Sequence, residues 1–299
     1  MVATLLGGCR DAPDAPAGAS AQTIALPAPG QPPPGLDAAL WREVGWFPAP
    51  VVVLSEFTRP ESASLIQWLA GATSDDPSCE RSLYAVDHYF AVAQRDAEPL
   101  PTHVVVGTTQ RSDVHACIQS LAGSRMRVDG GLTAIESSRG TMWLGFGSRG
   151  DQTVVVAHSD EIRVRAFMSG TKPLPHDSRI VHGLGHVDRT ADTWSVATGD
   201  AAVTLFGLAA QVHAFSIHGL TAGEASSTRL SAWADFGSHA KAEAAKTALD
   251  ALVGDYQSRE KVDLGYQVAP TTRGEVRLTA SMSTLAPAVE LVGYATTPP

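Results

Sequence analysis

Apolar and polar positions alternate along the chain in patterns that predict a mixture of short strands and helices. Short continuous apolar runs and period-two alternation indicate strands, whereas apolar residues spaced by three and four indicate helices. Strands are predicted at 51–54, 83–93, 102–108, 142–146, 153–157, 193–197, 212–217, 228–234 and 275–282. Helices are predicted at 58–71, 112–123, 159–168 and 201–210, after Ser238, and at 285–291.

The order of these elements recurs along the chain. Thr102 and Ser112 each lie 126 residues before their counterparts Thr228 and Ser238 (228 − 102 and 238 − 112), so a predicted strand and its following helix repeat in register. Each half reads strand, helix, strand, strand, helix and further strands, which is typical of a split βαβ unit with helices on one face. We therefore predict an α+β fold of two ferredoxin-like halves with mainly antiparallel sheets. A single doubly wound parallel sheet is the alternative.

A cysteine near the N-terminus stands in a distinctive context. Leu5-Leu6-Gly7-Gly8-Cys9 is an apolar run and two small residues before a cysteine, and residues 11–35 hold seven Pro and seven Ala. Such a composition stays extended and forms no packed core. The arrangement resembles the lipobox of bacterial lipoproteins, which implies lipidation at Cys9 and a lipid-anchored place in the cell envelope, at the outer membrane or facing the periplasm. Residues 1–6 are too short for a complete signal, so we expect them to be a remnant of one.

Residues 37–299 resemble bacterial lipoproteins of unassigned function that are built from tandem α+β repeats. The resemblance rests on the pattern of elements and implies no activity. The predicted organisation is therefore a signal remnant, lipobox and tether at 1–36, a first α+β domain at 37–170, a linker at 171–186 and a second domain at 187–299.

Charge narrows the classes of partner. The net charge is −9, with 31 acidic and 22 basic residues. Nucleic acids and anionic bilayer surfaces attract basic stripes, which the sequence lacks, so neither is expected as a partner. No segment after residue 36 approaches the roughly 18 apolar residues of a spanning helix. The expected partners are the lipid bilayer, through the acyl anchor, and an envelope protein or glycan.

Two cysteines remain if Cys9 is lipidated. An even pair in an oxidising compartment predicts a disulfide between Cys79 and Cys117. The alternative for Cys117 is a small buried hydrophobe on its predicted helix.

Metal-capable side chains gather in the predicted connector between the halves, at His176, His182, His186 and Asp188. In a helix, His182 and His186 would share a face, and a carboxylate would complete a three-ligand site. Two glycines lie between His182 and His186 and would weaken such a helix. Histidines in a polar connector are also commonly solvated. These residues define the alternative function, a metal-dependent hydrolase.

Other motifs give no catalytic set. Gly145-Phe146-Gly147-Ser148-Arg149-Gly150 matches a dinucleotide-binding string, but the following segment reads as a strand where that motif needs a helix, so a hairpin is predicted. Ser238-His239 is interpreted as a helix cap. Four tryptophans are assigned to the core: Trp41, Trp46, Trp194 and Trp233. We predict no catalytic residues and no cofactor, and interpret the protein as a non-catalytic, lipid-anchored envelope protein that binds or scaffolds another component.

Overall fold

The computed structural model describes residues 23–57, 86–94, 100–108, 110–120, 125–137, 140–170, 172–191, 193–198, 214–222, 227–260, 265–270 and 274–282. Cys9 and Cys79 lie outside these residues, as do all of the helices predicted at 58–71, 201–210 and 285–291.

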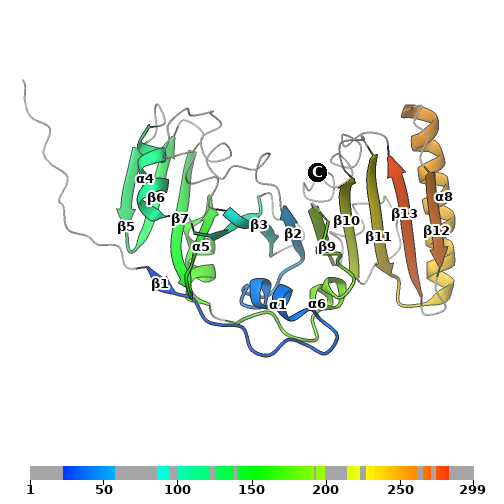
Figure 1. The fold of residues 1–299 in the computed structure, drawn as a ribbon, viewed down its shortest axis with the longest axis horizontal. Helices are drawn as coiled ribbons and strands as arrows, with labels where there is room; N and C mark the ends of the chain where they lie inside the picture. The colour runs from blue at the N-terminus through cyan, green and yellow to red at the C-terminus, as the bar shows by residue number, and fades with distance from the viewer. Residues whose placement is uncertain are drawn as a thin grey trace, which may run out of the picture.

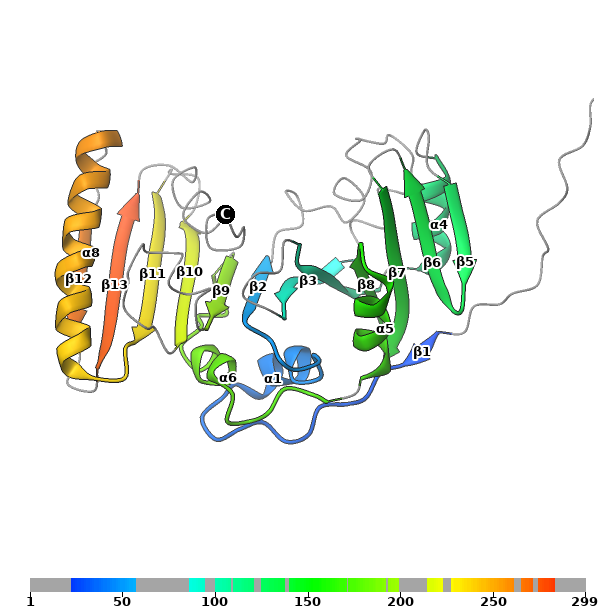
Figure 2. The same ribbon diagram turned by 180° about the vertical axis from the view of Figure 1, so that it is seen from behind.

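One mainly antiparallel sheet runs through the described part of the chain (Figure 1, and from behind in Figure 2). Its strand order is β12-β13-β11-β10-β9-β2-β3-β4-β8-β7-β6-β5, and β1 pairs in parallel with β7. The strands are β1 (Ile24–Ala25), β2 (Val53–Phe57), β3 (Val86–Ala93), β4 (Thr102–Gly107), β5 (Arg125–Asp129), β6 (Leu132–Ser137), β7 (Gly140–Arg149), β8 (Gln152–His158), β9 (Thr193–Ala197), β10 (Ala214–Ala222), β11 (Ser227–Asp235), β12 (Gly265–Pro270) and β13 (Glu275–Met282). The described helices are α1 (Ala38–Val44), α4 (Arg111–Ser120), α5 (Glu161–Ser169), α6 (Arg179–Leu184) and α8 (His239–Glu260). An α+β fold with antiparallel pairing is thus confirmed.

Helices cover both faces of the first half of the sheet. In β4 the side chains alternate, so Val104 and Val106 join one apolar cluster and Val105 joins another. Val164 of α5 packs in the first cluster and Val114 of α4 in the second. The two helices therefore lie on opposite faces, which departs from the single helical face expected for a ferredoxin-like half.

The seam between the two halves lies inside the sheet. β2 and β9 pair in antiparallel, with Ser55 opposite Ser195, and the two buried hydroxyl oxygens are 2.8 Å apart in a hydrogen bond. Residues 171–186, the predicted linker, include α6, whose Ile180 and Leu184 are buried. The sheet thus continues across the predicted boundary. The division into two ferredoxin-like domains stays a prediction, because much of the sequence that would complete each unit lies outside the described residues.

Residues 23–36, which we call the strap, lie along the body although the sequence places them in the tether. Figure 1 shows the strap in blue, running from β1 beside β7 along the lower edge of the molecule to α1. The Leu26 amide donates to the Ser148 carbonyl at 3.0 Å, and the Leu26 side chain is buried in the core. The Asp37 carboxylate then caps α1 by accepting from the Leu40 amide at 2.7 Å.

Several local predictions are confirmed. The glycine-rich string forms the β7–β8 hairpin, with Gly150 at a φ of 61° in the turn. The Ser238 hydroxyl accepts from the Lys241 amide at 3.4 Å at the start of α8. All four assigned tryptophans are buried. Among the described helices, none has the length and apolar character to span a membrane.

Candidate functional site

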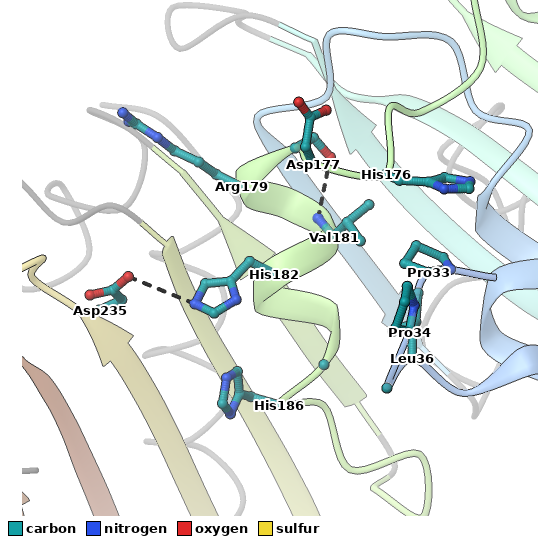
Figure 3. Close-up of a pocket in the computed structure, with 13 residues that line it drawn as sticks. Pro33, Pro34, Leu36, His176, Asp177, Arg179, Val181, His182, His186 and Asp235 are labelled. Atoms are coloured by element: carbon teal, nitrogen blue, oxygen red, sulfur yellow. Dashed lines mark hydrogen bonds and ion pairs between the residues drawn. The ribbon is translucent and has the colours of Figure 1, made fainter. Parts of the chain in front are cut away.

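A pocket of about 550 Å³ opens beside α6, where the connector between the halves meets the strap and the end of β11 (Figure 3). Its walls combine prolines, imidazole rings and charges of both signs. The lining residues are Pro33, Pro34, Gly35, Leu36, His176, Asp177, Ser178, Arg179, Val181, His182, Gly185, His186 and Asp235. Three of the four residues singled out as metal candidates are among them.

The sequence of α6 turns His182 toward this pocket. Ser178 begins the helix, with its hydroxyl accepting from the Val181 amide at 3.4 Å. The apolar residues Ile180 and Leu184 are buried in the core, and α6 packs on β9 and β10. Because these positions face inward, His182 lies on the outer side, and its side chain is 54% exposed.

His182 and His186 form a ring cluster with Trp233 of β11. The His186 ring stacks on Trp233, with ring centroids 3.6 Å apart and planes 11° apart. The His182 ring stands edge-on to both, at centroid distances of 5.1 Å from Trp233 and 5.6 Å from His186. Burial lowers the pKa of His186, and the neighbouring His182 lowers it further. His186 is therefore neutral at pH 7.

Asp235 completes the β11 side of the pocket. Its Oδ1 accepts from the Gly237 amide at 2.7 Å, and its Oδ2 lies 3.7 Å from His182 Nε2, as the dashed line in Figure 3 marks. Since His182 is more than half exposed, solvent screens this pair, and it contributes little to stability. More than half of the His182 side chain stays accessible to a ligand.

The opposite wall comes from the strap. In Figure 3, His176, Pro33 and Pro34 lie on that side, away from His182 and Asp235. The His176 ring stands edge-on to Trp41, with centroids 5.2 Å apart. Trp41 Nε1 in turn donates to the carbonyl of Gly30 in the strap at 3.0 Å. His176 therefore belongs to the strap side of the pocket.

The structure brings only part of the predicted metal cluster together. The rings of His182 and His186 are neighbours. Asp188 does not line the pocket, and its Oδ1 accepts from the amide and hydroxyl of Thr190 at 2.9 and 2.7 Å. No group of three or more His, Cys, Asp or Glu side chains in the described ranges is placed to hold a metal ion. Sequence reasoning assigned Trp233 to the core and did not single out Asp235. It placed neither beside the connector, because both lie on β11, far from the connector in sequence.

The remaining predicted features are placed as follows. Cys117 is fully buried in α4 and takes part in a disulfide, whose other half lies outside the described residues. Two glycines of the string at 145–150 serve close packing. A Cβ at Gly145 would approach Met168 Cγ to 2.6 Å, and one at Gly147 would approach Leu26 Cδ1 to 2.9 Å. The absence of side chains at Gly145 and Gly147 therefore lets α5 and the strap pack closely on β7.

The fold is similar to that of the solved protein TP0453. With its crystal form I the TM-score is 0.52 at 9% identity, covering 85% of this chain and 97% of that chain. With crystal form III the TM-score is 0.50 at 9% identity, covering 83% and 97%. At this identity the likeness shows the fold alone. No family model matches the chain, and no curated protein matches it.

Proposed function

We propose that this protein is a lipid-anchored component of the bacterial envelope that binds another envelope component, a protein or a glycan, without catalysing a reaction. The observation that carries this proposal is the construction of the pocket beside α6. Each of its histidines is used in ring packing, against Trp233 or Trp41. A lining of ring faces with charges of both signs suits recognition of a polar partner.

The anchor and the pocket are linked through the strap. Cys9 precedes the first strap residue, Thr23, by 14 residues (23 − 9). At roughly 3.3–3.6 Å per residue, such a segment reaches at most about 50 Å. An acylated Cys9 would therefore hold the body close to the bilayer, with the pocket available to other envelope components. The exported chain would also carry the Cys79–Cys117 disulfide, a pairing that the buried half-cystine at Cys117 supports.

The test is co-purification from native membranes, with the chain expressed behind a complete signal and its lipid intact. We expect a reproducible partner, and an intact mass that shows an acyl adduct and the loss of two thiol protons. His182→Ala and Arg179→Glu, both exposed in the pocket, should reduce recovery of the partner at least tenfold. His239→Ala changes an exposed histidine on α8 and serves as the matched control.

Two results would overturn the proposal. Stoichiometric zinc in the same sample, lost in His182→Ala, would establish the metal-dependent alternative. Equal recovery of the partner by the pocket variants and the control would show that the partner does not bind at the pocket.

A further inference from the structure

β5 is the strand at one end of the sheet, and its only partner strand in the described residues is β6 (Figure 1). Its five residues are Arg125, Met126, Arg127, Val128 and Asp129, and all but Met126 are exposed. Val128 is 42% exposed. An exposed edge strand presents unpaired backbone amides and carbonyls, which can pair with another strand.

Two copies of β5 have complementary sequences when they pair in antiparallel orientation. In the register centred on Arg127, Arg125 of each copy faces Asp129 of the other, which places opposite charges together twice. Met126 of each copy likewise faces Val128 of the other. Opposite charges and apolar pairs directly across two strands stabilise their pairing. The register that uses all five residues is therefore also the one that matches their charges.

The central residue, Arg127, would face its own copy, but its charge is compensated within each chain. Its guanidinium forms an ion pair with Asp129 and lies 3.8 Å from Glu136 Oε1 on β6. It also lies 5.5 Å from the centroid of the Trp143 ring. When Asp129 turns to the partner's Arg125, Glu136 and Trp143 still hold Arg127.

We propose that β5 pairs with β5 of a second copy of this chain in antiparallel, centred on Arg127, and joins two sheets into one two-fold dimer. A two-fold axis through one strand edge uses the same surface of both subunits, as most homodimers do. A five-residue strand buries little surface, so the dimer is weak and depends on protein concentration. The opposite edge, β12, ends in Pro270 and packs under α8, which makes it the poorer pairing edge.

The test is a charge exchange measured by sedimentation velocity, with the full chain carrying Cys9→Ser so that no acyl group or stray thiol contributes. The parent should dimerise as its concentration rises, and added salt should weaken the dimer. Arg125→Asp leaves two acidic residues on each β5 edge, and Asp129→Arg leaves three basic residues on it, so each variant should weaken self-association at least tenfold. Their equimolar mixture should dimerise again, because the basic residues at 125 and 129 of one variant then face the acidic residues at 129 and 125 of the other.

The double variant Arg125→Asp/Asp129→Arg should also dimerise by itself, which separates a lost pairing from a damaged fold. Asp151→Arg, in the exposed β7–β8 turn, is the matched control and should behave as the parent. A parent that remains monomeric at near-millimolar concentration would overturn the proposal and leave the edge to another partner. So would an Asp129→Arg variant that dimerises as well as the parent.

Discussion

At the scale of single residues, the buried carboxylate of Glu56 has a hydrogen-bond partner at each of its oxygens. It is buried on β2, directly opposite Trp194 of β9. Oε2 accepts from Trp194 Nε1 at 2.6 Å, and Oε1 lies 2.6 Å from His88 Nδ1 in a hydrogen bond. A buried charge is tolerated when its oxygens are satisfied in this way. Sequence reasoning did not single out Glu56, because both partners come from other strands.

Changing Glu56 to Gln is expected to alter the pH dependence of stability. The hydrogen bond with Glu56 is the main cause that raises the pKa of His88 above 6.5. A histidine with a raised folded-state pKa stabilises the protein fully below pH 6.5, and this contribution is lost as pH rises through the folded-state pKa. Glu56→Gln should therefore cost more unfolding free energy at pH 5.5 than at pH 9. Urea denaturation at both pH values measures the difference.

The comparison isolates His88 from the other histidines. Burial lowers the pKa of His103 to about 3, so His103 destabilises the fold as pH falls below 6.5, equally in both proteins. Glu136→Gln, at a half-exposed position on β6, should show no such pH-dependent loss. A Glu56→Gln penalty of the same size at pH 5.5 and pH 9 would contradict the assignment.

At the scale of elements, periodicity predicted the long and regular ones. The predicted strands 193–197 and 275–282 coincide with β9 and β13, and α8 begins directly after Ser238 as expected. The missed helices α1 and α6 are only seven and six residues long, too short for a helical period to stand out. β5 and β6 were also missed. The exposed edge strand β5 carries charges instead of an apolar run.

The candidate site was predictable only where it is local. The spacing of His182 and His186 predicted a shared face only for a helical connector. α6 ends at Leu184, before His186, but the two rings are neighbours in the structure. Trp233 and Asp235 come from another strand, and the proline wall comes from the strap, which composition alone assigns to a free tether. Such contacts depend on tertiary packing and leave no short-range signal in the sequence.

The strap is an element whose docking can be tested by itself. Leu26 is buried against Gly147, where a larger side chain has no room. Leu26→Ala should cost about 2–3 kcal/mol, near the lower end for a leucine truncated in a core. It should also speed hydrogen exchange at the residue 26 amide, which donates to Ser148. Gly147→Val should accelerate the same exchange by displacing Leu26. Urea denaturation and amide exchange provide the measurements.

Ile24 is the matched control on the same strand, because its side chain is 39% exposed. Ile24→Ala should change stability by less than about 1 kcal/mol, as expected for a partly exposed position. If Leu26→Ala proves as mild as Ile24→Ala, the strap does not contribute to the core.

At the scale of the whole molecule, the seam between β2 and β9 decides how the halves behave. The repeat in the sequence predicted two units, but no sequence pattern indicates which strands of two units will meet. In the structure the first strand of one half pairs with the first strand of the other, and Ser55 and Ser195 stand opposite each other at the middle of the pair. The halves therefore share one sheet and one row of backbone hydrogen bonds.

A shared seam predicts cooperative unfolding and a measurable coupling across it. Ser55→Ala or Ser195→Ala alone leaves a buried hydroxyl without its partner, which should lower the unfolding free energy by about 1–3 kcal/mol. The double variant removes both hydroxyls, so its loss should be smaller than the sum of the two single losses. Trp46 belongs to the first half of the chain and Trp194 to the second, and both pack in the same core cluster. Tryptophan fluorescence and far-ultraviolet circular dichroism should therefore follow a single urea transition. Two separate transitions, or strictly additive serine effects, would show that the halves fold independently and that the seam only joins them.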